Sequence, residues 1–205
     1  MQLTTANVAL WGAGMRERMR QRHINTAVAA KAKVEARQGK LPLVTVVDGR
    51  RDRREDEVKS RGNITYLFDP TPHAAKWLLA YLTAIAPVDK SKHADHRVFK
   101  SSFTFLVNGE EKWLFELDDM PFGSRVTIIN LRFGYSRLLE HGWSLQAPSG
   151  VMAVAAAAAK TTFRRSVQVE YAWMAVEADI TDDPDRDPIK GDYRYPVIHL
   201  QALQS

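Results

Sequence analysis

The sequence predicts an α+β fold, in which helices pack an antiparallel β-sheet and an N-terminal helical segment and an extended β-arm come first. Three observations support this expectation. Helix-forming residues without proline fill the first forty positions, β-rich runs recur between residues 43 and 176, and an Asn-Gly pair marks a tight hairpin. The length of 205 residues, with 45% hydrophobic and 26% charged residues, indicates one soluble globular domain with appendages.

Four segments are expected along the chain. They are a basic helical segment (1–40), an extended two-stranded arm (41–70), an α+β core domain (71–178), and an acidic linker with a C-terminal strand or tail (179–205). A break near His23–Thr26 would divide the first segment into two helices. In the arm, β-rich runs at Leu43–Val47 and Asn63–Phe68 flank a stretch that is too polar to bury.

The first half of the core is expected to be a helix followed by a hairpin. Thr71 is the expected N-cap of the amphipathic helix, with Pro72 at its first position and Pro87 as its stop. The run 98–117 then predicts two strands around the Asn108–Gly109 turn.

The second half is expected to add a strand over 124–131, a short helix over Tyr135–Glu140, an alanine-rich helix and a strand over 166–176. Small side chains let another backbone approach closely, so we expect the alanine-rich helix to pack tightly on a sheet. The apolar run Tyr195–Leu203 predicts a short strand that pairs with the same sheet or with a neighbouring subunit.

The net charge of +5 is unevenly distributed. Basic residues gather in the first forty positions: Arg16, Arg18, Arg20, Arg22, Lys31, Lys33 and Arg37. Acidic residues gather near the other end: Glu177, Asp179, Asp182, Asp183, Asp185, Asp187 and Asp192. Three interpretations remain open, namely nucleic-acid affinity at one end, head-to-tail attraction between copies, and two solvated segments.

Composition excludes several kinds of site. The absence of cysteine excludes disulfides, thiolate zinc sites and thiol catalysis, and fits a reducing compartment. No apolar run approaches the roughly 20 residues that span a bilayer. The first twenty residues lack the order of charges and apolar residues in a secretory signal, so cytoplasmic synthesis is expected.

Candidate catalytic and metal-binding residues are few. The stretch His93–His96 has two imidazoles and a carboxylate, but no second ligand cluster at a recognisable spacing, so a solvated loop is the better interpretation. Glu140 and His141 suggest acid-base chemistry, but adjacent residues of a helix do not face each other. No phosphate loop, nucleophile elbow or dinucleotide fingerprint is present. We therefore expect no catalytic residue, cofactor or metal.

A family resemblance comes from a run of short motifs in a fixed order. The phrases TAIAPVDKS, SFTFLVNG and VTIINLRFGYSRLLEHGWSLQAPSGVM precede the alanine-rich helix. This order resembles the neck or tail-completion proteins of long-tailed bacteriophages, also called minor tail components, over about residues 75–170. The matching residues are Pro87, Val88, Asp89, Asn130, Tyr135, Leu139, Glu140, Gly142, Trp143, Ser144, Gln146, Ala147, Pro148 and Gly150. The chain departs from the family pattern at Lys90–Ser91, where Thr-Gly is usual, and in LRFGYS, which replaces PYA; both ends lack a clear counterpart.

The resemblance implies a structural virion protein without enzymatic activity, assembled in the host cytoplasm and located at the head-tail junction. The implied assembly is a sixfold ring that caps the proximal end of the tail and helps join it to the head connector. The implied partners are further copies of the chain, the tail terminator or tube protein, the head-closure or connector protein, and DNA that passes through the lumen without sequence-specific binding, with no membrane involved.

Two groups of residues are candidates for contacts in such a ring. The structural or interface candidates are Tyr135, Glu140, Trp143, Gln146 and Pro148. Within this group, Trp143 is expected to anchor the turn, and Glu140 and Gln146 to hold backbone groups there or to reach a neighbouring subunit. The candidates for charges facing the lumen or a partner are Arg50, Arg51, Arg53 and Arg54. The alternatives are a basic nucleic-acid-binding module and a small hydrolase that uses Glu140 and His141.

Overall fold

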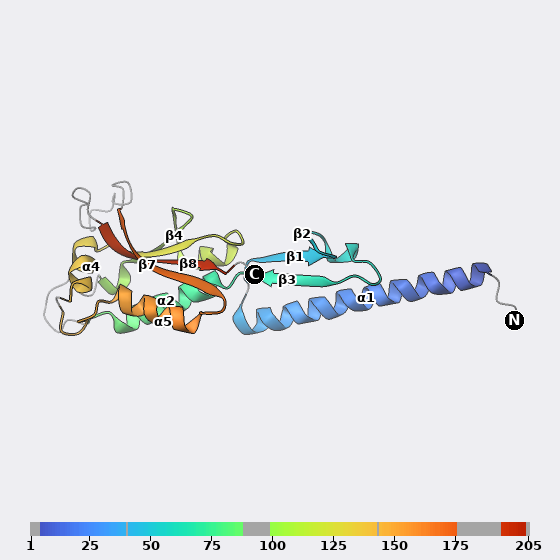
Figure 1. Cartoon of the computed structure of the whole chain (residues 1–205), viewed down its shortest axis with the longest axis horizontal. Helices are drawn as coiled ribbons and strands as arrows, with labels where there is room; N and C mark the ends of the chain where they lie inside the picture. The colour runs from blue at the N-terminus through green and yellow to red at the C-terminus, as the bar shows by residue number, and fades with distance from the viewer. Residues whose placement is uncertain (1–4, 40, 88–98, 143, 176–193, 204–205) are drawn as a thin grey trace. The chain divides into compact units, whose positions relative to one another are not determined.

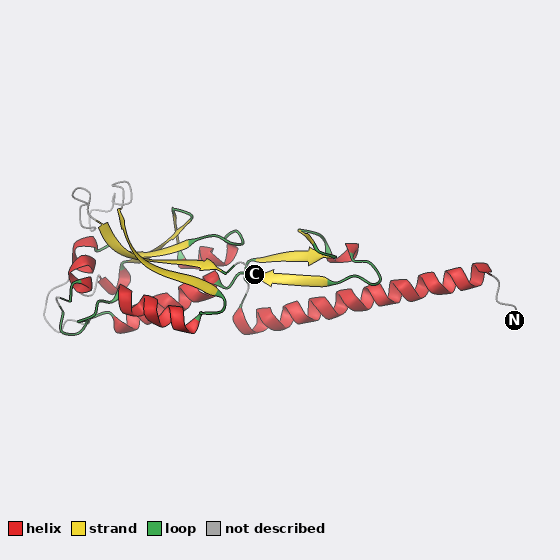
Figure 2. Ribbon diagram, viewed as in Figure 1, coloured by secondary structure: helices red, strands yellow, loops and turns green. Residues whose placement is uncertain are grey.

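The computed structural model describes residues 5–39, 41–87, 99–142, 144–175 and 194–203 (Figure 1). The chain divides into two compact units, Met1–Asp69 and Pro70–Ser205. Helices and antiparallel sheets occur in the described part, as the sequence predicts for an α+β protein (Figure 2). The stretch His93–His96, Trp143 and the acidic run 177–192 lie outside the described residues.

The first unit consists of one long helix and a small antiparallel sheet. Its elements are α1 (Thr5–Gln38), β1 (Leu43–Val47), β2 (Arg50–Arg51), a 3-10 turn η1 (Glu55–Glu57) and β3 (Ile64–Phe68), with strand order β2-β1-β3. The two predicted β-rich runs are confirmed as the paired strands β1 and β3, with Leu43 opposite Phe68 and Val47 opposite Ile64. The short strand β2, which was not predicted, makes the sheet three-stranded. Helix α1 continues through His23–Thr26, so the break considered from the sequence is absent.

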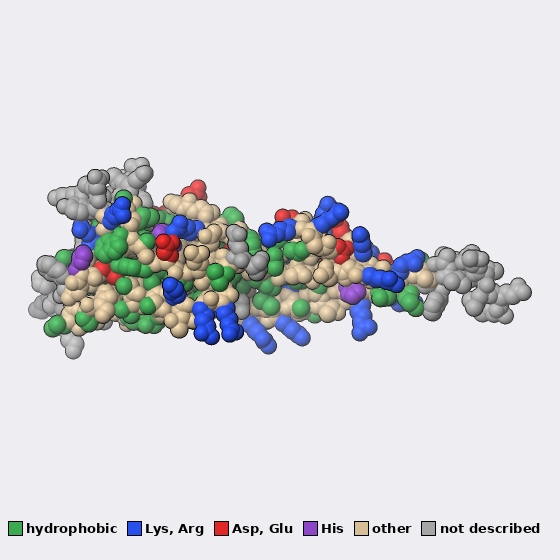
Figure 3. Space-filling view, in the orientation of Figure 1, with side chains coloured by type: hydrophobic (Ala, Val, Ile, Leu, Met, Phe, Trp, Pro, Cys, Tyr) green, Lys and Arg blue, Asp and Glu red, His purple; other side chains and the backbone are tan. Residues whose placement is uncertain are grey.

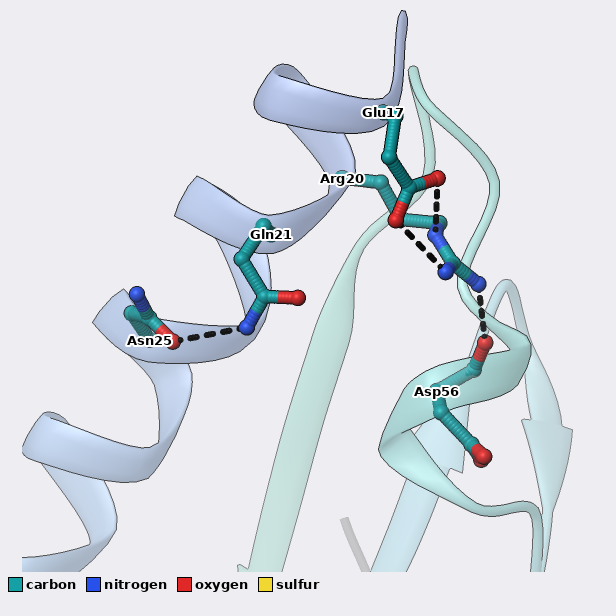
Figure 4. A network of polar contacts seen from close by, with 5 residues as sticks. All are labelled: Glu17, Arg20, Gln21, Asn25 and Asp56. Carbon is teal, nitrogen blue, oxygen red and sulfur yellow. Dashed lines mark hydrogen bonds and ion pairs between the residues drawn. The ribbon is translucent and has the colours of Figure 1, made fainter.

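Polar contacts join α1 to η1 and β3 of its own unit. Arg20 binds the carboxylate of Glu17 at 2.8 and 3.0 Å and donates a third hydrogen bond to the carbonyl oxygen of Asp56 at 2.7 Å (Figure 4). Farther along the helix, the ammonium group of Lys31 lies 5.5 Å from the ring centroid of Tyr66. Burial, and then a hydrogen bond to Glu55, raises the pKa of the Tyr66 hydroxyl to about 12. These contacts fix which face of α1 is turned toward the sheet.

The second unit has a five-stranded antiparallel sheet in the order β5-β4-β6-β8-β7. Its strands are β4 (Phe103–Val107), β5 (Glu110–Lys112), β6 (Val126–Asn130), β7 (Val167–Ala175) and β8 (Arg194–Ala202). Strand β8 lies between β6 and β7, so the apolar run near the C-terminus pairs with the same sheet, over nine residues. It is an inner strand of the core and not part of a tail.

Helices α2 (Thr71–Ile85) and α5 (Met152–Thr162) cover one face of this sheet (Figure 1). Phe105, Ile128 and Leu200 project toward them and are almost fully buried. Along α5, the small side chains of Ala155 and Ala159 are fully buried, which confirms the predicted tight packing of this helix on the sheet. A smaller apolar cluster on alternate residues of the strands includes Leu106, Ile129 and Val197.

Several element boundaries differ from the predictions. Helix α2 begins at Thr71 with Pro70 as its N-cap, because the two prolines pre-set the backbone of the first turn one residue earlier. Residues 99–101 are helical and not part of the following strand. After the Asn108–Gly109 turn, the second strand ends at Lys112, and the 3-10 helix η2 (Leu114–Asp119) replaces its expected continuation. The short helix α4 (Phe133–Glu140) starts two residues earlier than predicted.

Candidate functional site

The motif that carries the family resemblance forms a corner between the end of α4 and the start of α5. Glu140 is the last residue of α4, and its carboxylate reaches across the loop to the first turn of α5. The Oε1 atom accepts hydrogen bonds from the backbone amides of Val151 and Met152 at 2.7 and 2.6 Å, and Oε2 accepts one from Ala153 at 3.1 Å. The carboxylate therefore caps the helix and opposes the positive end of its dipole.

Strand β7 contributes a fourth group to this corner. The hydroxyl of Tyr171 donates a hydrogen bond to Oε2 of Glu140 at 3.1 Å. Burial, and then the negative charge and hydrogen bond of Glu140, raises the pKa of the Tyr171 hydroxyl well above its usual value, so it remains a donor across the neutral range. One side chain thus joins α4, α5 and the sheet, and sequence reasoning did not find Tyr171 because it is distant in the chain.

Two glycines leave the space that this arrangement needs. Gly150 has φ of +81°, and a Cβ atom there would lie 2.5 Å from Oε2 of Glu140. At Gly142, where φ is +72°, a Cβ atom would lie 2.9 Å from the carbonyl oxygen of Pro148. Both positions favour glycine because of their backbone conformation and because of a close neighbour. The path of this loop therefore explains why the motif has glycine two residues after Glu140 and again at position 150.

The loop between these glycines consists of successive tight turns. The amide of Ala147 donates to the carbonyl oxygen of Ser144 at 3.0 Å, and the amide of Gly150 donates to that of Ala147 at 3.2 Å. Ala147 is buried, whereas Gln146 and Pro148 are exposed. The structure thus confirms for Glu140 the expected role of holding backbone groups, and it leaves Gln146 and Pro148 as surface residues of the corner.

Glu140 and His141 have different partners. The carboxylate of Glu140 is directed to the amides of α5, whereas the ring of His141 is stacked on Trp173, with 5.7 Å between the ring centroids. Tyr135 is farther back on α4 and packs edge-to-face on Phe99 at 5.3 Å. This arrangement brings Glu140 and Tyr171 together but does not place His141 in hydrogen-bond contact with Glu140.

The arginines of the arm belong to the first unit. Arg50, Arg51, Arg53 and Arg54 are all exposed. Arg53 forms an ion pair with Glu57 at 3.0 Å, and Arg54 with Asp56 at 3.0 Å. Part of their positive charge is therefore balanced locally, as the alternation of Arg with Asp and Glu in the sequence predicts.

Sequence reasoning missed an exposed apolar surface on the second unit, which we call the aromatic patch (Trp113, Leu114, Phe115 and Phe122). Trp113 and Phe115 are each 74% exposed, and they lie in a run for which the sequence predicts a strand. Phe115 also lines a hollow of about 540 Å³ with Met120 and Pro121. The available signal was the row of acidic residues around Trp-Leu-Phe, which is unusual for a core strand.

No group of three His, Asp or Glu side chains in the described ranges has metal-binding geometry. Among the helices in those ranges, none combines the length and the apolar character that a bilayer crossing requires. No protein-family model, curated protein or solved structure matches the chain.

Proposed function

We propose that this chain is a ring-forming structural protein of the head-tail junction of a long-tailed bacteriophage. In this role it caps the proximal end of the tail and joins it to the head connector. The observation that carries the proposal is the E-x-G-W-S-x-Q-A-P-x-G motif from Glu140 to Gly150, by which the sequence resembles neck and tail-completion proteins.

The geometry of the motif supports a structural interpretation of that resemblance. Glu140 accepts three backbone hydrogen bonds and one from Tyr171, so its oxygens are engaged in holding two helices and a strand together. Residues that hold a corner of the fold in place are expected in a protein whose subunits must keep a constant shape in order to assemble. This interpretation favours a structural protein over a hydrolase that uses Glu140 and His141.

Ring formation also requires two different contact surfaces on each copy. The described residues provide an exposed apolar surface on the second unit and an exposed basic helix on the first. Tail terminator or tube protein, head-closure or connector protein, and DNA in the lumen remain the proposed partners. The exposed arginines of the arm are candidates for facing the lumen or a partner.

The test is the assembly state of the purified full-length chain. We expect closed rings in negative-stain images and a single oligomer of about six copies in sedimentation experiments. A chain that stays monomeric at the highest soluble concentration and does not join purified tails would contradict the proposal. The gene order supplies an independent check, since portal and capsid genes are expected upstream and a tube gene downstream.

A second candidate function, a nucleic-acid-binding module, is favoured by one specific observation. Arg18, Arg22 and Lys33 line the same exposed face of α1. Figure 3 shows Lys and Arg side chains, in blue, projecting along this helix. Contacts of these side chains with phosphates would make duplex binding weaken steeply with salt, because bound counterions are released. Binding of a fluorescent DNA duplex at 50 and 200 mM salt tests this, and no binding at low salt would exclude it.

A further inference from the structure

The aromatic patch is unusual for a surface that faces only water. Trp113 and Phe115 are each 74% exposed, and Leu114 and Phe122 are 41% and 37% exposed. Isolated exposed apolar residues are common, but several large ones on one short segment mark contact surfaces. Tryptophan and other aromatic residues are also enriched in the core of protein interfaces.

The backbone beneath the patch is firmly held. The amide of Trp113 donates to the carboxylate of Glu116 at 2.6 Å, and the amide of Glu116 donates to the carbonyl oxygen of Trp113 at 3.0 Å. Leu117 anchors η2 in the core with no exposed area, and Asp118 binds Lys76 on α2 at 2.6 Å. A partner would therefore meet a preformed surface and lose little free energy in ordering it.

The surroundings of the patch are acidic. Residues 107–121 contain five acidic residues and one lysine, which gives a local charge of −4 in a chain of net charge +5. The acidic residues are Glu110, Glu111, Glu116, Asp118 and Asp119. Glu110 and Asp119 line the hollow beside Phe115. A surface of this kind is complementary to one that combines apolar side chains with positive charge.

The face of α1 that points away from its own sheet has that composition. At 3.6 residues per turn, Arg18 and Arg22 lie about half a turn from Arg20 and Lys31, which contact η1 and β3 of the first unit. Met19, 43% exposed, lies beside Arg22 on this outer face. Among the described residues, neither Arg18 nor Arg22 has a carboxylate partner. The outer face therefore has unpaired positive charges next to an exposed methionine.

We propose that the outer face of α1 in one copy of the chain docks on the aromatic patch of a neighbouring copy. The methionines Met15 and Met19 pack on the aromatic rings, and Arg18 and Arg22 approach the acidic surround. The inference rests on the proposed ring-forming function and names the surfaces that would join adjacent subunits. The contact is heterologous, since a helix of one copy meets a different surface of the next, and such contacts generate closed rings or filaments.

The absence of cysteine from the sequence permits a direct test. Two single-cysteine proteins, Met19→Cys and Phe115→Cys, are mixed and treated with a short bis-maleimide linker. A product that contains one copy of each can arise only between chains, and we expect it as the main cross-linked species. The control pairs Met19→Cys with Leu145→Cys, because Leu145 is fully exposed but lies outside the patch.

Binding measurements test the energetic contribution of the two surfaces. Trp113→Ala combined with Phe115→Ala should raise the self-association constant Kd at least about tenfold, because buried aromatic anchors dominate interfaces. Leu145→Ala should leave Kd unchanged. Arg18→Glu with Arg22→Glu should weaken association, and mixing this variant with Glu110→Lys plus Glu111→Lys should restore it in part.

Each outcome decides between the two proposals. Rings that form without Met19–Phe115 cross-links above the Leu145 control overturn the inference and leave the proposed function standing. The same holds if Trp113→Ala with Phe115→Ala associates like the unmodified chain, or if Arg18→Glu with Arg22→Glu loses only DNA binding. Absence of any self-association overturns both proposals.

Discussion

The corner at Glu140 makes a sharp prediction for Gly150→Ala. Gly150 has φ of +81°, and a Cβ atom there would lie 2.5 Å from Oε2 and 2.8 Å from Cδ of Glu140. Such distances are not tolerated, so the carboxylate must move away from the amides of α5. The substitution therefore combines backbone strain with the loss of a helix cap.

The expected magnitude follows from adding these effects. Alanine in the left-handed region costs about 1 kcal/mol. Losing the cap costs about 1 kcal/mol more. A Tyr171 hydroxyl left without its acceptor adds about 1 kcal/mol. We expect Gly150→Ala to lower the free energy of unfolding by about 3 kcal/mol in total.

Gly123 is a matched control for the cost of placing alanine in the left-handed backbone conformation. Its φ of +80° is almost the same, but no atom lies within 4 Å of a Cβ atom added there. Gly123→Ala should therefore lower the free energy of unfolding by only about 1 kcal/mol, the cost of the backbone conformation alone.

A double-mutant cycle with Glu140→Ala isolates the clash. Removing the carboxylate also removes the atoms that a Cβ at position 150 would meet, so Gly150→Ala should then cost only about 1 kcal/mol. Urea denaturation of the four proteins, followed by circular dichroism and tryptophan fluorescence, measures these differences. If Gly150→Ala costs the same with and without Glu140, the reasoning is refuted.

Three further predictions concern other polar groups of the second unit. Burial, and then the charge of Arg125, lowers the pKa of His199, so the unfolded chain binds more protons as the pH falls through about 6.5. Stability should decrease below that pH by at most about 1.4 kcal/mol per pH unit and be flat above it, and urea titrations of His199→Gln should lack this step. Asn130 donates to the carbonyl oxygen of Phe99 at 2.7 Å, so Asn130→Asp should lower the free energy of unfolding by about 3 kcal/mol in thermal melts, and an unchanged melting temperature would contradict this. Lys76→Met should cost less than about 1 kcal/mol, because the ion pair with Asp118 is partly exposed, and the difference should shrink in 1 M salt.

Local sequence signals predicted most of the elements. The Asn108–Gly109 pair marks its hairpin because few other residues adopt that turn. Helix α5 and strand β7 follow from their composition and periodicity alone. Glu140 was also identified as a residue of the corner, since a short motif placed it at the end of one predicted helix and shortly before the next.

Non-local pairing could not be predicted in the same way. Strand β8 lies between β6 and β7, and its partner Val126 on β6 is more than seventy positions from Leu200. The sequence shows that the run is apolar but not which neighbours it has. Tyr171 was missed for the same reason, since only the folded sheet brings its hydroxyl to Glu140.

The aromatic patch shows a second reason why sequence patterns do not always predict the structure. Trp113, Leu114 and Phe115 are apolar and β-forming, so the pattern predicts a strand. In the structure, the hydrogen bond between the Trp113 amide and Glu116 favours a 3-10 turn, which turns two aromatic rings toward solvent. A run that is typical of a strand can therefore form an exposed turn when a nearby carboxylate accepts a hydrogen bond from its backbone.

In both the corner and the patch, a glutamate that binds backbone amides decides the local fold. Glu140 binds the first amides of α5, and Glu116 binds the amide before η2. The first interaction ties the motif by which the family resemblance is identified to α5 and the sheet, and the second exposes apolar side chains for which we propose a partner. Because the corner involves interior contacts, substitutions there should change stability first. Substitutions in the patch should change association between copies without changing the free energy of unfolding. Measuring both quantities for each variant therefore distinguishes a residue that stabilises the fold from a residue that binds a partner.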